Sequence, residues 1–257
     1  MRASGMRSME RDAVAIVTGA AGGIGSSVVA ALADRGVAVA GWDRPGADFS
    51  TSQRYCIDAG VGWASFEVDV RDREAVMEAG RASARLGLVR YGVNTAGIDD
   101  LQPTTEMSSD EWRRVFEVNT EGVLSCCVSQ FHAISEQGNG GAIVNVASIS
   151  GMIVNRDCAP HTAYAASKAA TVHMTHNLAV EWAGHGIRVN AVSPGYTATA
   201  MTRSNSEETL RAFRKQSPMG RLAQPEEIAR PIVFLLSDDA SFITGANLPI
   251  DGGVTLW

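Results

Sequence analysis

The sequence has few of the residues that build metal centres, disulfide frameworks or nucleic-acid surfaces. Its 257 residues include four cysteines, with no CxxC pair and no Cys/His cluster at zinc spacing. So few thiols are typical of a protein from a reducing compartment. Acidic residues outnumber basic ones by 28 to 22, and the net charge of −6 argues against a nucleic-acid surface. We therefore expect no metal, no disulfide and no nucleic-acid partner.

Long apolar runs are also missing. Nothing approaches the roughly 18 uninterrupted apolar residues that suggest a membrane-spanning helix. The first twelve residues, MRASGMRSMERD, lack the apolar stretch of a secretory signal. We expect a soluble, cytoplasmic protein with no membrane partner. Residues 1–11 are interpreted as a flexible N-terminal arm and residues 12–257 as one domain, because no repeat, low-complexity tract or linker divides them.

Short apolar runs alternate with helical patterns along the rest of the chain. A predicted strand at 13–17, a helix at 26–35 and a strand at 37–40 have the length of one βαβ unit. Further strands are expected at 63–68, 88–94, 142–147, 187–193 and 247–250, and helices at 50–60, 72–86, 109–137, 161–183, 207–216 and 225–236. This alternation predicts an α/β fold with a doubly wound, Rossmann-like parallel sheet between two layers of helices.

A glycine-rich turn, TGAAGGIG at residues 18–25, follows the first strand and opens the first helix. Glycine lacks a Cβ, so the backbone can approach a pyrophosphate closely, and the helix N-terminus supplies N–H groups and partial positive charge. The spacing is G-x-x-x-G-x-G and not the G-x-G-x-x-G of the common dinucleotide motif. The predicted phosphate-binding residues are Gly19, Gly22, Gly23, Ile24 and Gly25.

Asp43 ends the second predicted strand. A carboxylate there can accept hydrogen bonds from the adenosine ribose hydroxyls, and it would repel a 2′-phosphate. This favours NAD over NADP as the cofactor. Arg44 beside it could instead attract a 2′-phosphate, so NADP remains the alternative.

Tyr164 and Lys168 lie four residues apart on a predicted helix, and that spacing puts them on one face. A phenol with its pKa near 10 is a poor base at pH 7. A nearby ammonium favours the phenolate and lowers that pKa, so Tyr164 could exchange a proton with a substrate oxygen. An ordinary helix surface is the alternative, because a YxxxK spacing is common by chance.

Polar or turn-forming residues follow three of the predicted strands. Asn94 ends one strand, Ser148 follows another, and Pro194 and Gly195 follow a third. In a doubly wound sheet, ligands bind beyond the carboxyl ends of the strands. A serine there could donate a hydrogen bond to a substrate carbonyl or alkoxide. We therefore expect these residues to converge on one rim.

Taken together, these motifs resemble the short-chain dehydrogenase/reductase family in its compact single-domain form. The matching residues, in family order, are Thr18-Gly19-x-x-x-Gly23-x-Gly25, Asp69-Val70, Asn94-Thr95-Ala96-Gly97, Asn119, Ser148, Tyr164-x-x-x-Lys168, Pro194-Gly195, Gly245 and Asp251-Gly252-Gly253. Two departures stand out. Thr95 replaces a frequent second asparagine, and Ser148 and Tyr164 are 16 residues apart, farther than is usual in the family. The extra residues lie in the segment 155–161, which would border the substrate.

The resemblance implies a role for each matching residue. Tyr164 would be the general acid/base, Lys168 would lower its pKa and bind the nicotinamide ribose, and Ser148 would orient the substrate oxygen. Asn119 would hold a water that links Lys168 to solvent. Cofactor contacts would come from Asp69 and Val70 at the adenine, Asn94, Ala96 and Gly97 along the adenosine ribose, and Pro194, Gly195, Thr197 and Thr199 towards the nicotinamide. No metal is needed, because the cofactor carries the hydride.

The predicted function is an NAD(H)-dependent oxidoreductase that interconverts a secondary alcohol and a ketone. The alternatives are an NADPH-linked 3-oxoacyl-thioester reductase and a non-catalytic nucleotide-binding regulator. The predicted substrate lining is polar and favours a hydroxylated substrate such as a sugar or polyol: Asp99, Ser148, Ser150, Asn155, His161 and Tyr196. Asp99 and Asp100 are otherwise interpreted as solvated loop charges.

The resemblance also implies a homotetramer that pairs through the long helices at 109–137 and 161–184. Four apolar residues there could serve either an interface or the core: Val115, Phe116, Val123 and Leu124.

Overall fold

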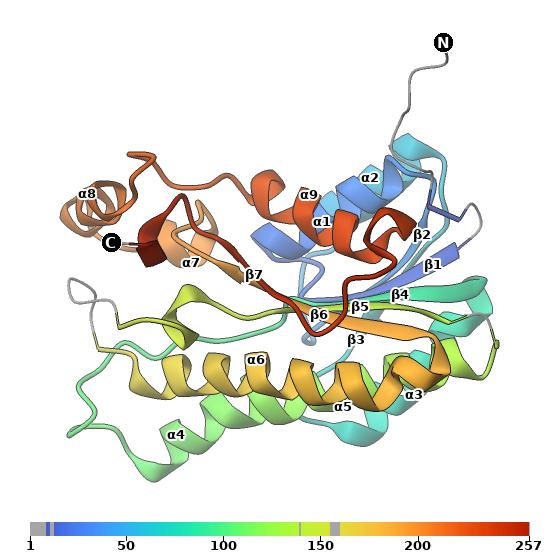
Figure 1. Ribbon diagram of the computed structural model, residues 1–257, viewed down its shortest axis with the longest axis horizontal. Helices are drawn as coiled ribbons and strands as arrows, with labels where there is room; N and C mark the ends of the chain where they lie inside the picture. The colour runs from blue at the N-terminus through green and yellow to red at the C-terminus, as the bar shows by residue number, and fades with distance from the viewer. Residues whose placement is uncertain (1–8, 11–12, 139, 155–159, 257) are drawn as a thin grey trace.

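A seven-stranded parallel sheet forms the centre of the molecule (Figure 1). The computed structural model describes residues 9–10, 13–138, 140–154 and 160–256. The strands run in the order β3-β2-β1-β4-β5-β6-β7. They are β1 (Ala13–Thr18), β2 (Ala38–Asp43), β3 (Trp63–Glu67), β4 (Leu88–Asn94), β5 (Gly141–Val146), β6 (Ile187–Pro194) and β7 (Asn247–Ile250). The doubly wound, Rossmann-like sheet that the alternation predicted is confirmed.

Helices cover both faces of the sheet (Figure 1). One layer holds α1 (Gly23–Ala33), α2 (Ser50–Ala59) and α9 (Pro225–Leu236), and the other holds α3 (Arg73–Ser83), α4 (Ser109–Phe116), α5 (Val123–Ser135) and α6 (Thr162–Trp182). Two shorter helices, α7 (Ala200–Arg203) and α8 (Glu207–Gln216), follow β6. Among these helices, α7 alone was not predicted, because four residues are too few for an amphipathic pattern.

Two apolar cores hold the layers together, one on each side of the sheet. All six residues of β1 are buried. Because successive side chains point to opposite faces, Val14 and Ile16 pack in the core beneath α3, α5 and α6, whereas Ala15 and Val17 pack in the core beneath α1 and α9. This explains why the strand has an unbroken apolar sequence.

The long helix predicted at 109–137 is interrupted. Between α4 and α5 the residues Glu117–Gly122 form a π-helical turn, a feature often found at functional sites. Asn119 lies within this turn and is fully buried. Gly122 packs so tightly against Val70 that an added Cβ would lie 2.7 Å from the valine Cγ2. The apolar repeat of 3.6 residues in the sequence cannot reveal a π-helical turn, because such a turn shifts the repeat by only one residue.

A hydrogen-bonded network of polar side chains links β4 and β5 to α5 and α6 in the core. Asn94 Nδ2 donates to Asn145 Oδ1 at 2.8 Å, and Gln130 Nε2 donates to Asn94 Oδ1 at 2.9 Å. Asn145 Nδ2 in turn donates to Thr175 Oγ1 at 3.0 Å. The side chain of Asn94, which the resemblance assigned to the cofactor ribose, therefore points into the core. Only its backbone remains for a ligand.

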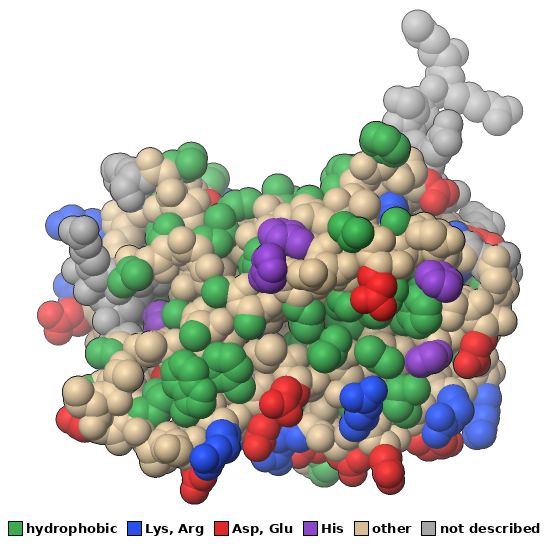
Figure 2. All heavy atoms as spheres, turned by 60° about the horizontal axis from the view of Figure 1, so that its bottom comes forward, with side chains coloured by type: hydrophobic (Ala, Val, Ile, Leu, Met, Phe, Trp, Pro, Cys, Tyr) green, Lys and Arg blue, Asp and Glu red, His purple; other side chains and the backbone are tan. Residues whose placement is uncertain are grey.

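The outer face of α4, α5 and α6 carries apolar side chains among charged ones (Figure 2). Of the four residues that could serve core or interface, Val115 and Val123 are buried, Phe116 is half-buried, and Leu124 is 38% exposed. Within the described residues, no helix is long and apolar enough to cross a membrane.

Candidate active site

The glycine-rich turn and the segment after β4 meet where the strand order reverses. Thr95 Oγ1 donates to the Thr18 carbonyl at 2.7 Å, and the Ala96 N–H donates to Thr18 Oγ1 at 3.3 Å. Gly19 has a φ of +66°, and a Cβ there would lie 2.6 Å from Thr95 Oγ1. A Cβ on Gly25 would overlap the Gly19 carbonyl oxygen. Both glycines are therefore required by close packing of the turn itself.

The N-terminus of α1 is open to a ligand. Its N-cap, Gly22, has no side chain to cap the helix, and the first turn holds no acidic residue. The N–H groups of the first helical residues, Gly23, Ile24 and Gly25, have no partner within the helix. Such a set of donors fits a pyrophosphate. The Thr199 methyl would lie 3.1 Å from a Cβ on Gly23, so the segment after β6 borders the same turn.

Asp43 holds the turn as well as ending β2. Its Oδ2 accepts the Ala21 N–H at 2.9 Å, and its Oδ1 accepts the Arg44 N–H at 2.9 Å. An ionised carboxylate has about four acceptor positions, so two hydrogen bonds leave capacity for ribose hydroxyls. The contact with Ala21 was not expected from the sequence. The glycine turn and the adenosine end of a dinucleotide would therefore share one carboxylate.

Ser148, Tyr164 and Lys168 come together beyond the end of β5. Burial raises the pKa of Tyr164 to about 12, and a hydrogen bond with Ser148 opposes that rise. The Lys168 Nζ lies 5.7 Å from the centroid of the Tyr164 ring and donates to the Val146 carbonyl at 2.9 Å. Burial lowers the pKa of Lys168 to about 8. The pKa of Tyr164 is raised because desolvation of the phenol outweighs the hydrogen bond with Ser148.

Asn119 links the segment after β4 to α6. Its Oδ1 accepts the Ile98 N–H at 2.9 Å, and its Nδ2 donates to the Ile98 carbonyl at 2.8 Å and to Ser167 Oγ at 3.0 Å. A Cβ on Gly97 would lie 3.3 Å from both Asn119 Oδ1 and Lys168 Nζ. A side chain at this position would therefore press against both polar groups.

Two further polar residues border Tyr164. The His161 ring meets the Tyr164 ring edge-on, with the centroids 5.7 Å apart. Burial raises the pKa of Asp99, and the charges of His161 and Lys168 oppose that rise. His161 therefore lies against the Tyr164 ring, and the charge of Asp99 acts on both Tyr164 and Lys168. Ser150 N–H donates to Ser148 Oγ at 3.1 Å, and Asn155 lies outside the described residues.

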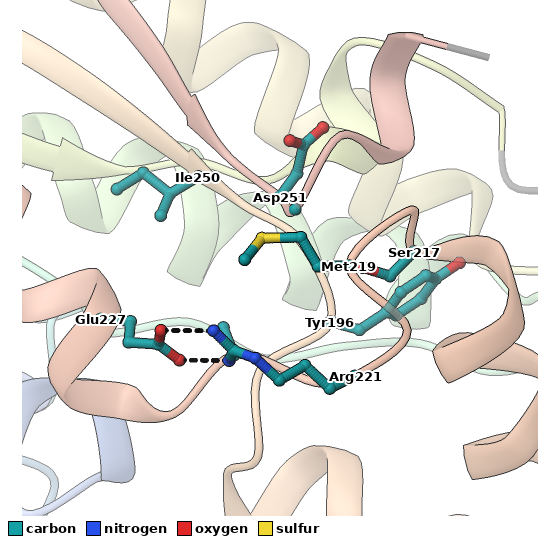
Figure 3. Close-up of a pocket in the computed structure, with 9 residues that line it drawn as sticks. Tyr196, Ser217, Met219, Arg221, Glu227, Ile250 and Asp251 are labelled. Atoms are coloured by element: carbon teal, nitrogen blue, oxygen red, sulfur yellow. Dashed lines mark hydrogen bonds and ion pairs between the residues drawn. The ribbon is translucent and has the colours of Figure 1, made fainter.

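Tyr196 lies in a different environment. Its ring stacks on Phe213 at 4.1 Å, and its hydroxyl donates to Gln216 Oε1 at 2.6 Å. It lines a cavity of about 80 Å³ between the segment after α8 and the end of β7, beside the Arg221–Glu227 ion pair (Figure 3). Ser148, Tyr164 and Lys168 do not line this cavity. Tyr196 therefore lines a cavity to which none of these three residues contributes.

The remaining expected cofactor residues occupy two places, a groove beside Asp69 and the end of β6. Asp69 pairs with Arg71, whose hydrogen bonds lower the pKa of the carboxyl, and both line an open groove with Val70. Pro194 ends β6, and Thr197 Oγ1 donates to the Gly195 carbonyl at 3.1 Å.

Among the residues that the structure describes, no three His, Cys, Asp or Glu side chains could together hold a metal ion.

Comparison with known proteins assigns the family. A family model described as enoyl-(acyl carrier protein) reductase matches residues 19–255. The chain belongs to the short-chain dehydrogenase/reductase family. It is 41% identical over 249 residues to the galactitol 2-dehydrogenase (L-tagatose-forming) of Cereibacter sphaeroides, covering 95% of this chain and 96% of the relative.

Two other relatives agree with this assignment. The D-threitol dehydrogenase of Mycolicibacterium smegmatis is 38% identical over 247 residues, covering 95% of this chain and 93% of its own. A crystal structure of a short-chain type dehydrogenase/reductase from Mycobacterium marinum matches with a TM-score of 0.88 and 33% identity, covering 96% of each chain. The protein is therefore an oxidoreductase of this family that uses a nicotinamide cofactor, NAD or NADP.

The first prediction concerns the turn. The Gly25→Ala variant should lose at least tenfold in affinity for reduced nicotinamide cofactor, because the new Cβ would overlap the Gly19 carbonyl and displace the turn. Cofactor fluorescence titration measures this. Gly184→Ala is the control, since no atom lies within 4 Å of a Cβ added there and its φ is not positive. Equal affinity in the two variants would contradict the prediction.

Proposed function

We propose that this protein interconverts a secondary alcohol and a ketone with NAD(H), using Tyr164 as general acid/base. The observation that carries the proposal is the grouping of three side chains beyond β5. The Tyr164 hydroxyl shares a hydrogen bond with Ser148, and the Lys168 ammonium lies 5.7 Å from the phenol ring. All three lie at the sheet edge that also presents the uncapped N-terminus of α1.

In the proposed reaction the residues of this chain hold the substrate oxygen and move one proton. During reduction, the Tyr164 hydroxyl gives its proton to the ketone oxygen while the Ser148 hydroxyl donates a hydrogen bond to the same oxygen. During oxidation, Tyr164 Oη takes the alcohol proton. Lys168 would bind the nicotinamide ribose, and Asn119 would hold a water on the path from Lys168 to solvent. The bound cofactor supplies or accepts the hydride.

Cofactor contacts are proposed for the same edge. Gly19, Gly22, Gly23, Ile24 and Gly25 would hold the pyrophosphate, and Asp43 the adenosine ribose. Asp69 and Val70 would lie at the adenine, with the backbone of Asn94, Ala96 and Gly97 along the ribose. Pro194, Gly195, Thr197 and Thr199 would hold the nicotinamide end, and the short distance between Thr199 and the glycine turn supports that placement.

The decisive experiment uses Tyr164→Phe, which removes only the phenol oxygen. We expect turnover on a panel of alcohols and ketones to fall by about 10²–10⁴-fold, the usual contribution of a general acid/base. Affinity for the cofactor should stay within twofold. Tyr55→Phe, at an exposed tyrosine on α2, should leave both unchanged. Undiminished turnover in the Tyr164 variant would refute the proposal.

The pKa of Tyr164 adds a second readout of the same variant. Alcohol oxidation needs the phenolate, and a raised pKa keeps that form scarce near pH 7. The oxidation rate of the wild-type protein should therefore rise with pH from 7 to 9, whereas ketone reduction, which needs the phenol, should not rise. The residual rate of Tyr164→Phe should show no such rise.

The preference for NAD is proposed from Asp43, whose charge would repel a 2′-phosphate. Wild-type protein should bind NADH at least tenfold more tightly than NADPH. Asp43→Asn keeps an acceptor for the Ala21 N–H but removes the charge, so the ratio should fall towards one. The Arg44→Ala variant measures how much Arg44 contributes to NADPH affinity, separately from the repulsion by Asp43. A wild-type preference for NADPH would overturn the choice of cofactor.

An NADPH-linked 3-oxoacyl-thioester reductase is the second candidate. The 35% identity over 246 residues to the 3-oxoacyl-[acyl-carrier-protein] reductase of Thermotoga maritima and the position of Arg44 support it. Including a 3-oxoacyl thioester with NADPH in the same panel tests it directly. Cofactor binding without turnover on any compound would instead indicate a nucleotide-binding regulator.

Within the alcohols, a polyol is the proposed substrate class. Asp99 and His161 border Tyr164 and offer polar contacts to a second hydroxyl group. Two relatives are a galactitol 2-dehydrogenase and a D-threitol dehydrogenase. Asp99→Ala should lower kcat/KM for a polyol at least tenfold and leave that for a simple secondary alcohol within twofold. Asp110→Ala, at a side chain that is 92% exposed, is the control. Equal losses on both substrates would contradict this role.

A homotetramer paired through α4, α5 and α6 is proposed for the assembly. The exposed apolar residues on these helices, Trp112, Leu124 and Val180, support it.

A further inference from the structure

Asp100 is a buried carboxylate in the segment after β4. Its side chain is 5% exposed, so its interpretation as a solvated loop charge is wrong. Asp100 Oδ1 accepts the backbone N–H of Tyr164 at 2.7 Å. The proposed acid/base residue is thus bonded through its own backbone to a residue 64 positions earlier in the chain.

Helix α6 lacks a cap from its own sequence. His161 occupies the N-cap position and makes no side-chain cap hydrogen bond, and the first turn holds no acidic residue. An N-cap side chain normally accepts the N–H of the second or third helical residue. Tyr164 is the third residue of α6, so Asp100 makes from another segment the hydrogen bond that a local cap would make. Its negative charge also suits the positive end of the helix dipole.

Two other contacts tie the same segment to the same helix. Thr104 Oγ1 and Thr162 Oγ1 share a hydrogen bond of 2.7 Å. Ile98 makes two hydrogen bonds with the Asn119 side chain, which also donates to Ser167 on α6. The start of α6 is therefore fixed relative to the segment that contains Gly97.

The second carboxylate oxygen of Asp100 lies in an unfavourable environment. Oδ2 is buried, and no hydrogen-bond partner for it occurs among the described residues. Burying a carboxylate oxygen without a partner costs free energy. We infer that another interaction of Asp100 offsets this free-energy cost. The hydrogen bond from the Tyr164 N–H to Asp100 Oδ1 is such an interaction, and it links Asp100 to α6.

We propose that Asp100 is a positioning residue: it caps α6 from the segment after β4 and thereby fixes the Tyr164 phenol relative to Ser148 and to the nicotinamide side of the site. The proposal rests on the proposed function of Tyr164. A misplacement of about 1 Å at a reacting group can cost about 10²-fold in rate. The cap would therefore influence turnover without touching substrate or cofactor.

Three variants test this role. Asp100→Ala removes the acceptor, and Asp100→Asn keeps an oxygen for the Tyr164 N–H but adds a buried amide N–H₂ beside the unpartnered position. Asp72→Ala is the matched control, because Asp72 caps α3 in the same way by accepting the Ala75 N–H at 3.0 Å. For each variant we would measure kcat and KM with NAD and a polyol, the thermal unfolding temperature, and hydrogen exchange of the backbone amides at the start of α6.

Asp100→Ala should lower kcat at least tenfold, leave KM for NAD within twofold, and speed amide exchange at Tyr164. Asp100→Asn should keep kcat within about threefold of wild type and keep Tyr164 protected, although its unfolding temperature falls. Asp72→Ala should lose stability without losing kcat. Wild-type kcat in folded Asp100→Ala protein, or unchanged exchange at Tyr164, would overturn the proposal. A tenfold fall in Asp100→Asn with Tyr164 still protected would also overturn it.

Hydrogen exchange separates this proposal from the proposed function. A wild-type protein without turnover on any alcohol or ketone would contradict the proposed function. Faster exchange at Tyr164 in Asp100→Ala alone would still support the cap in that case.

Discussion

The parallel direction of all seven strands is the constraint on which the rest of this molecule depends. Parallel neighbours require a crossover between them, and these crossovers place helices on both faces of the sheet. The carboxyl ends of all the strands then lie along one edge. Residues from β1, β4, β5 and β6 consequently reach one edge although β1 and β6 are more than a hundred positions apart in the chain.

Burial both builds the site and alters its acid–base chemistry. The packing that holds Tyr164 and Lys168 raises the pKa of the phenol to about 12 and lowers that of the amine to about 8. Both shifts favour the neutral form, as desolvation requires. The Ser148 hydroxyl works against the shift at Tyr164. Desolvation is therefore the largest contribution to the pKa of both groups.

Hydrogen-bonded polar side chains in the core help to fix the helices against the strands that carry the site. Asn94 and Asn145 lie on adjacent strands, and Gln130 and Thr175 extend the network into α5 and α6. Because each of these buried groups would be left without a partner if its neighbour moved, the network favours one register of helices against strands. Ser148 follows β5 and Lys168 belongs to α6, so that register also sets the distance between them.

The sequence by itself determined the features that depend on local patterns. Apolar periodicity located every strand and all helices but α7, since burial on one or two faces leaves a local signature. The glycine turn and the Tyr164–Lys168 spacing were recognisable for the same reason. Tertiary structure alone decided the inward turn of Asn94, the second role of Asp43, the raised pKa of Tyr164 and the capping of α6 by Asp100. Each of these features depends on a contact with a distant segment or on the depth of burial. Neither property can be inferred from the residues that are adjacent in the sequence.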